Sequence, residues 1–146
     1  VEVGTKTTVG VSANGYDTRP GQDSKNGGCK EDGCAPALTR DGVTDDIESR
    51  WSCSQDLVPD GAFCEIEFVF ETPQDIADVQ VAFPFEAESY YWLQVEVNGE
   101  FVRSHSSYLQ PWLAFNGLGV KEYDVHTVTL RHHNTDEHEW INILEV

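Results

Sequence analysis

Short segments in which apolar and polar residues alternate, separated by turn-forming residues, are the feature of this sequence that most constrains its fold. Between residues 62 and 70, Ile66 and Phe68 alternate with Glu65 and Glu67, and this period of two is typical of a half-buried β-strand. Further strands are predicted at residues 7–13, 76–83, 91–97, 100–105, 125–131 and 139–146. No segment of the sequence shows an apolar helical stripe with caps. We therefore predict an all-β chain.

The dipeptide Asn98-Gly99 lies between two predicted strands and indicates a hairpin, because both residues tolerate a positive φ. Residues 14–36 are rich in Gly and predict a long loop, which is either functional or clipped by Cys29 and Cys34. About eight short strands with turn-rich connections are typical of a single antiparallel β-sandwich, or jelly roll. We predict one domain over residues 1–146, a length that allows a single core.

The four cysteines contain no CxxC pair, so three disulfide pairings are open. We favour the local pairing of Cys29 with Cys34 and of Cys53 with Cys64. A zinc site with four thiolates is the rival interpretation, but the spacings fit short zinc knuckles poorly. Disulfides imply an oxidising, extracellular compartment, and we expect a secreted protein.

Acidic residues dominate the charge, with 26 Asp and Glu against 9 Lys and Arg and a formal net charge of −17. This balance excludes a general nucleic-acid binder and a partner for anionic membranes. Hydrophobic residues make up 39% of the chain, enough for a packed core. We find no apolar run long enough for a membrane span and no leader sequence, and we expect a mature or excised piece that lies outside the membrane.

Three motifs together resemble the discoidin, or coagulation factor 5/8 type C, domains. They are residues 35–42 (APALTRDG) with 48–52 (ESRWS), the segment 79–83 (VQVAF), which matches the central strand of such domains, and the ending at 140–146 (WINILEV). Within the galactose-binding-like superfamily, the chain is most similar to the carbohydrate-binding modules appended to marine polysaccharide lyases. The resemblance covers nearly the whole chain and implies a secreted β-sandwich that binds glycans without catalysis.

The resemblance also implies one structural calcium ion that ties the first loop to the last strand. Calcium takes six to eight hard oxygens from carboxylates and carbonyls. The implied ligands are Leu38, Asp41, Val43, Ser49, Leu144 and Glu145, with Asp45 or Asp46 as a replacement for Val43. The alternative is that Asp41 belongs to a simple turn and that the neighbouring acids are solvated. We favour calcium, because repulsion among these acids would otherwise be uncompensated.

A glycan site needs exposed aromatic side chains that stack on sugar C–H faces, beside polar groups that bind two hydroxyls at once. The candidates are Tyr16, Arg19, Arg103, His105, Tyr108, Trp112, His133 and Asn134. We expect a shallow site formed by some of them. Trp51 and Trp140 are assigned to the core or to loop packing, Trp92 to either face of its strand, and Arg50 to pairing with nearby acids.

The histidines His132, His133 and His138, with acids around them, give a weak signal for a zinc or copper site. We favour exposed loop histidines instead, because His132 and His133 would face opposite sides of a strand.

The best-supported function is therefore a non-catalytic carbohydrate-binding module with a structural Ca²⁺ ion, monomeric and tethered to a larger carbohydrate-active enzyme. The sequence has no Gly-x-Ser-x-Gly, His-Glu-x-x-His, Walker or dinucleotide motif. One alternative is a small jelly-roll polysaccharide lyase that uses Arg103, His105, Tyr108 and Gln110. A second alternative is a calcium-dependent adhesion or lectin domain at a cell surface.

Overall fold

The structure is a computed structural model of residues 1–146. It describes residues 9–18, 29, 33–40, 49–83, 90–108, 116–132, 140–143 and 145–146. Of these, residues 55, 90, 91, 106–108, 116 and 140 are described by their backbone alone. In these ranges, no helix is long and apolar enough to cross a membrane.

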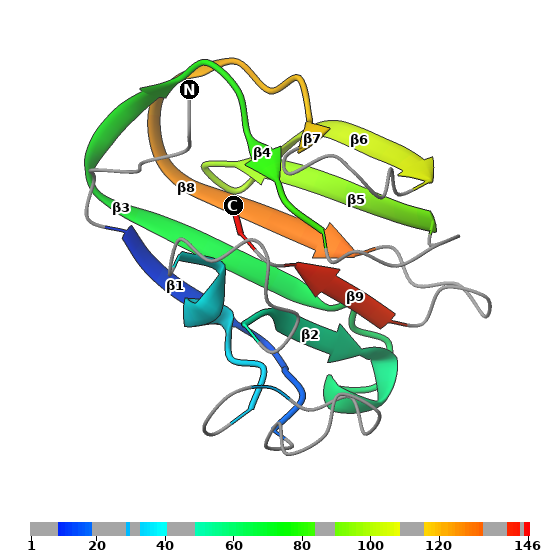
Figure 1. The fold of residues 1–146 in the computed structure, drawn as a ribbon. Coiled ribbons are helices and arrows are strands. Elements are labelled where there is room, and N and C mark those ends of the chain that lie inside the picture. The colour runs from blue at the N-terminus through cyan, green and yellow to red at the C-terminus, as the bar shows by residue number, and fades with distance from the viewer. Residues whose placement is uncertain are drawn as a thin grey trace.

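A five-stranded antiparallel sheet forms the larger layer of the molecule (Figure 1). Its order is β1 (Val9–Ala13), β3 (Glu65–Ile76), β8 (Glu122–His132), β5 (Tyr90–Val97) and β6 (Glu100–Tyr108). The three central strands have alternating side chains with one buried face, as their sequences predict. β1 and β6 are the edge strands.

Four short strands form the second layer. β2 (Trp51–Ser54) pairs with β9 (Trp140–Ile143), and β4 (Gln80–Val81) pairs with β7 (Asn116–Gly117). The bridge between Ala82 and Glu145 connects the two pairs, so that the order across this layer is β2, β9, β4, β7. The described chain is thus an antiparallel β-sandwich, which confirms the predicted fold class.

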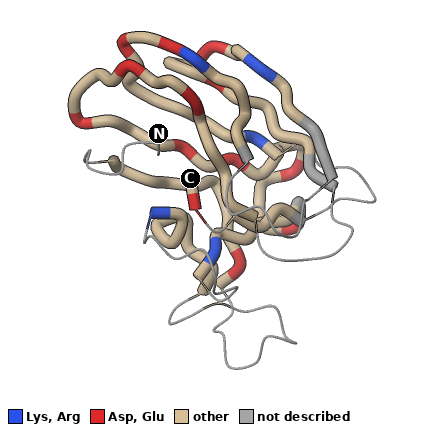
Figure 2. Tube along the Cα trace, turned by 45° about the horizontal axis from the view of Figure 1, so that its top comes forward, with Lys and Arg blue, Asp and Glu red and all other residues tan. Residues whose placement is uncertain are grey.

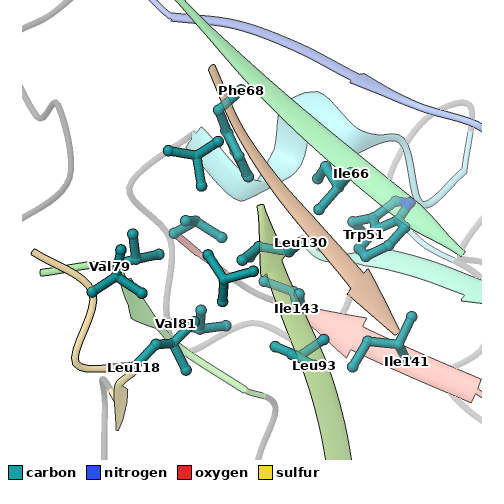
Figure 3. Close-up of a cluster of buried hydrophobic side chains, with 14 of the residues drawn as sticks. Trp51, Ile66, Phe68, Val79, Val81, Leu93, Leu118, Leu130, Ile141 and Ile143 are labelled. Carbon is teal, nitrogen blue, oxygen red and sulfur yellow. The ribbon is translucent and has the colours of Figure 1, made fainter. Parts of the chain in front are cut away.

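The hydrophobic core lies between the two layers. Figure 3 shows side chains of both layers pointing toward one another, with Ile66, Phe68, Leu93 and Leu130 on one side and Trp51, Ile141 and Ile143 on the other. All seven are at most 2% exposed. Trp51 is a core residue, as predicted, and its indole N–H donates to the Gly15 carbonyl at 3.1 Å.

Several elements differ from the predicted ones. β3 continues to Ile76 with two register shifts, and Pro73 lies in the irregular part, where a missing N–H breaks no regular ladder. The predicted strand at residues 76–83 is therefore wrong: Ile76 ends β3, and only Gln80–Val81 forms a strand. The 3₁₀ helices η2 (Pro36–Arg40) and η3 (Gln55–Leu57) and the strands β2 and β7 were not predicted.

The hairpin at Asn98 is confirmed. Asn98 and Gly99 have φ values of 51° and 80°, and they connect β5 to β6. The Asn98 side-chain oxygen accepts from the N–H groups of His126 and Thr127 at 2.7 and 3.2 Å, and its amide donates to the Asp124 carbonyl at 3.1 Å. The turn is thereby tied to the neighbouring strand β8.

Two disulfides join Cys29 to Cys34 and Cys53 to Cys64, the local pairing favoured from the sequence. No cysteine is left free, so the rival interpretation of a zinc site with four thiolates is wrong. The Cys53–Cys64 bond joins β2 in the second layer to the residue before β3 in the first. It therefore connects the two layers covalently.

Candidate functional site

The ends of six strands, β2, β3, β5, β6, β8 and β9, meet at one edge of the sandwich, which we call the loop edge. Tyr90 at the start of β5 pairs with Tyr108 at the end of β6, and Leu93 pairs with His132 at the end of β8. The His132 N–H donates to the Cys64 carbonyl at 2.8 Å. Through the Cys53–Cys64 disulfide, Ser54 and its partner Trp140 lie at the same edge.

The first loop also begins at the loop edge. The Asn14 N–H donates to the Glu65 carbonyl at 3.2 Å, and the Glu65 N–H donates to the Asn14 side-chain oxygen at 2.9 Å. These two bonds fix the chain where it leaves β1, just before Tyr16. Tyr16 is half-buried and packs against the core cluster.

Half of the predicted glycan ligands lie outside the described residues, namely Arg19, Trp112, His133 and Asn134. The described residues that flank three of them are nonetheless at the loop edge: Tyr108 precedes residues 109–115, and His132 and Trp140 flank residues 133–139. The backbone of Tyr108 lies there as well. The topology therefore brings the ends of these candidate segments to a common edge with Tyr16.

Arg103 is placed away from this edge. It lies opposite Val95 in β6, is exposed, and donates from Nη1 to the Gly119 carbonyl at 3.2 Å. Its position is five residues before Tyr108, or about 17 Å along the strand. β6 is also four strand positions from β1, about 19 Å across the sheet. Arg103 and Tyr16 thus belong to different parts of the surface.

His105 lies opposite Leu93 and is half-buried. Because opposite residues of an antiparallel pair share a face, its side chain is on the core side of the edge strand β6. It is closer to the loop edge than Arg103, three residues before Tyr108.

The described part of the predicted calcium site brings the first loop to the end of the last strand. η2, which contains Leu38, contacts Val146: the Val146 N–H donates to the Thr39 carbonyl at 3.0 Å, and Arg40 Nη1 donates to the Val146 carbonyl at 2.8 Å. Glu145, next to Val146, is 8% exposed. The sequence-distant partners expected of the site are thus neighbours.

The residues present fit calcium by their donor chemistry. Leu38 supplies a carbonyl, Ser49 a hydroxyl or carbonyl and Glu145 a carboxylate, and all are hard oxygens of the kind calcium prefers. Ser49 is 2% exposed, so its oxygen atoms face the protein interior. The other implied ligands, Asp41, Val43, Asp46 and Leu144, lie outside the described residues, as does Asp45. Among the described residues, no three or more His, Cys, Asp and Glu side chains are grouped as a metal site.

A buried polar layer lies on the other face of β2 and β9, under the first loop. Arg50 is 6% exposed, and its Nε donates to the Asn142 side-chain oxygen at 3.0 Å, which also accepts from the Ser52 hydroxyl at 2.6 Å. The Asp17 N–H donates to the Ser52 carbonyl at 2.8 Å, and Asp17 is 3% exposed. Arg50, for which we predicted pairing with acids, therefore also donates a hydrogen bond to the side-chain amide of Asn142.

His132 is 1% exposed, so the interpretation of His132 as an exposed loop histidine is wrong. It continues the inward-facing series of Val128 and Leu130 in β8, and this parity was visible in the sequence. His133 and His138 lie outside the described residues.

Sequence reasoning missed a polar group on the solvent-facing side of the five-stranded sheet. Arg131 pairs there with Glu65 and Glu96, and Trp92 lies on the same face of β5. Figure 2 shows that acidic positions recur along the described strands and turns, whereas Lys and Arg are few. This group could have been predicted from the alternation of residues along the strands. Glu65, Arg131 and Gln94 each lie next to buried residues on three adjacent strands, so their side chains point to the outer face.

Comparison with known proteins places the fold. No family model and no curated protein sequence matches the chain. Among solved structures, a pectin-binding carbohydrate-binding module is similar with a TM-score of 0.59 and 18% identity, over 96% of this chain and 89% of that chain. CBM32 of AlyQ, in complex with 4,5-unsaturated mannuronic acid, is similar with a TM-score of 0.61 and 14% identity, over 93% and 90%. GH31 CBM32-2, bound to GalNAc, is similar with a TM-score of 0.58 and 12% identity, over 95% and 96%.

These similarities span nearly the full length of both partners in each case. The chain thus has a β-sandwich fold similar to that of these carbohydrate-binding modules. The resemblance inferred from the sequence motifs is confirmed at the level of the fold.

Proposed function

We propose that this chain is a non-catalytic carbohydrate-binding module, tethered to a larger carbohydrate-active enzyme, that binds a polysaccharide or its chain ends. One observation carries the proposal: the fold is shared over at least 93% of the chain with a pectin-binding module and with modules in complex with 4,5-unsaturated mannuronic acid or bound to GalNAc. Fold alone does not specify a ligand. The side chains at the loop edge must supply the recognition chemistry.

We place the site at the loop edge. Tyr16 and Tyr108 adjoin it, and the segments that carry Trp112, His133 and Asn134 begin or end there. Aromatic rings beside amide and imidazole groups are the combination that sugars require, since C–H faces stack on rings and hydroxyls bind the polar groups. Arg19, in the first loop, completes this set in the proposal, while Arg103 is left out because of its distance along β6.

Retardation in native gels that contain single polysaccharides tests the proposal, with pectin, alginate, galactan and xylan as the panel. We expect the chain to be retarded by at least one of them, and Trp112→Ala to lose that retardation. The matched control is Tyr123→Ala, because Tyr123 is an aromatic residue 66% exposed on β8, at the opposite end of that strand. Retardation by none of the panel would count against a binding module.

The absence of catalysis is tested with the same polysaccharides. We expect incubation with pectin or alginate to release no unsaturated product that absorbs in the ultraviolet. Formation of such a product, dependent on His105 or Tyr108, would favour a lyase instead.

We further propose a structural calcium ion between η2 and Glu145. The contact of Thr39 and Arg40 with Val146 supports it, because it brings the implied ligands Leu38 and Glu145 to the same place. An ion that binds only the folded state at 100 times its Kd stabilises it by about 2.7 kcal/mol. We expect excess EDTA to lower the Tm of the chain and to leave the Tm of Asp41→Asn unchanged. Equal effects of EDTA on both proteins, or no effect on either, would contradict the site.

An extracellular location completes the proposal. Both disulfides need an oxidising compartment to form and persist. Expression in a reducing cytosol should therefore yield less folded protein than export to an oxidising compartment.

A further inference from the structure

The solvent-facing side of the five-stranded sheet carries a contiguous polar group that the proposed loop-edge site does not use. We call it the outer patch; it consists of Glu65, Trp92, Gln94, Glu96, Ser104 and Arg131. Register places its members on four adjacent strands: Glu65 lies opposite Arg131, Arg131 opposite Gln94, and Gln94 opposite Ser104. The second layer of the sandwich covers the other face of this sheet, so the outer patch faces solvent (Figure 1).

Arg131 is held at the centre of the patch by two carboxylates. Its Nε donates to Glu65 at 2.5 Å, and its Nη2 donates to Glu96 at 3.3 Å. The side chains of Arg131, Glu65 and Glu96 are 28%, 34% and 21% exposed, respectively, so they are partly shielded from water but accessible to a ligand. A guanidinium has five N–H donors, and these two contacts use two of them on a side chain that is 28% exposed. The patch therefore presents fixed donors beside fixed carboxylate acceptors.

Trp92 adds an aromatic surface with a fixed orientation. Its indole N–H donates to the Ser104 hydroxyl on β6, and the residue is half-buried. Its position two residues before Gln94 puts it on the same face of β5, about 7 Å along the strand. Gln94 is half-buried, and within the described part of the chain its side-chain amide has no hydrogen-bond partner. An oriented ring thus adjoins an amide with unused donors and acceptors.

This combination suits a saccharide. Hydroxyl pairs on a pyranose bind an Arg–carboxylate pair or an amide in a bidentate manner, and the apolar face of the sugar stacks on an indole. The strand spacing of about 4.8 Å sets Arg131 and Gln94 close enough to bind neighbouring hydroxyls of one chain. Groups that are already fixed lose little conformational freedom on binding.

The charge of the surface determines the class of saccharide. The outer face around the patch has the carboxylates of Glu65, Glu67 and Glu96, and its one cation among the described residues is Arg131, which is already paired. A uronate chain would be repelled by this balance and would find its arginine neutralised. A neutral chain meets no such penalty.

We propose that the outer patch is a second saccharide-binding surface, which takes the interior of a neutral oligosaccharide chain across β5 and β8. It uses none of the residues proposed as glycan ligands at the loop edge, although Glu65 of the patch is also bonded to Asn14 there. Binding at the two surfaces can therefore be measured separately.

The test is an NMR titration of the ¹⁵N-labelled full chain with cellohexaose, mannohexaose and laminarihexaose, and with hexagalacturonate as the anionic comparison. The signals to follow are the Trp92 indole N–H, the Gln94 side-chain amide and the Arg131 Nε–H. We expect at least one neutral hexasaccharide to shift all three, and hexagalacturonate to shift none of them. No shift with any neutral sugar, or equal shifts with hexagalacturonate, would overturn the proposal.

Variants separate the two surfaces. Trp92→Ala should weaken neutral binding by about tenfold or more. Gln94→Ala, which removes no side-chain hydrogen bond to the described residues, should weaken it severalfold without loss of folding. Tyr123→Ala is the aromatic control and should bind as the parent does.

If Trp112→Ala loses polysaccharide retardation while the patch signals still shift, both surfaces exist. If Trp112→Ala has no effect and the patch signals shift, only the loop-edge proposal fails. If Trp112→Ala loses retardation and the patch signals do not shift, only the outer-patch proposal fails. Unchanged affinity of both Trp92→Ala and Gln94→Ala would overturn the outer patch.

Discussion

The two ends of the sandwich are held by different chemistry. At the loop edge, the Cys53–Cys64 disulfide and the Asn14–Glu65 pair join the layers and strands. At the opposite end, which we call the hairpin edge, polar side chains accept hydrogen bonds from turn N–H groups: Asn98 from β8, Asp75 from Asp124 and Asp78 from Gly119. Asp75 and Asp78 at the hairpin edge are therefore structural acceptors, whereas the loop edge is where the segments with predicted glycan ligands begin or end.

Among substitutions at the hairpin edge, Asp78→Ala should lower the free energy of unfolding the most. Its Oδ1 accepts from the N–H groups of Val79, Gly119 and Val120 at 2.9, 2.7 and 3.1 Å. Asp78→Ala leaves three donors unsatisfied, and we expect a loss of about 3 kcal/mol in the free energy of unfolding, measured by urea denaturation. Asp60→Ala, at an exposed acid, is the control and should cause almost no change. Equal effects of the two variants would remove the distinction between structural and solvated acids.

The two disulfides should stabilise the fold to different extents, because they close loops of different length. Cys53 and Cys64 are 11 residues apart, whereas Cys29 and Cys34 are 5 apart. Loop-closure entropy predicts a loss of about 3 kcal/mol for Cys53→Ser with Cys64→Ser, and of about 2 kcal/mol for Cys29→Ser with Cys34→Ser. Thermal unfolding of both double variants measures the difference. A larger loss for the second pair would contradict the importance given to the bond between layers.

Substitution of Asn98 tests whether the hairpin turn stabilises the fold without affecting the loop edge. Asn98→Ala removes three side-chain hydrogen bonds and forces a Cβ residue without a polar side chain to keep a φ of 51°. We expect a loss of about 2 kcal/mol. Asn98→Asp keeps an acceptor for His126 and Thr127 and should cost less in chemical denaturation. If Asn98→Ala also weakened glycan retardation, the two ends would not be independent.

Tyr16 gives the smallest expected effect on stability and a test of the loop edge. Tyr16→Phe keeps the ring that packs on the core cluster and removes only the hydroxyl, so the Tm should hardly change. Loss of one neutral hydrogen bond to a sugar would weaken binding by about fivefold, measured by calorimetry with the retained polysaccharide. A lower Tm with unchanged affinity would assign Tyr16 to packing alone.

Local patterns predicted much of the fold. Ile66 and Phe68 alternate with acids, and Asn98-Gly99 favours its turn without help from the rest of the chain. The strand β2 was missed because all four residues from Trp51 to Ser54 are buried, so no alternation marks them. It exists because of β9, about ninety residues away along the chain, and a local pattern cannot show such a partner.

The candidate site was less predictable than the fold. Motif resemblance correctly paired the first loop with the last strand, as the Thr39–Val146 contact shows. It could not show that Arg103 lies on one edge strand, β6, while Tyr16 follows the other edge strand, β1, because strand order depends on long-range pairing. The burial of His132 could be predicted from its alternation with Leu130, because both lie on the inward-facing side of β8.

The pairing of β2 with β9 also has a consequence for the order of folding. Both disulfides and the β5–β6 hairpin join residues near one another in the sequence, so they can form early at little cost in chain entropy. The second layer cannot close until β9 reaches β2, with Trp51 opposite Ile143. Contacts of such long sequence separation slow folding. A shortened chain that lacks β9 would therefore expose Trp51 and the inner face of the large sheet.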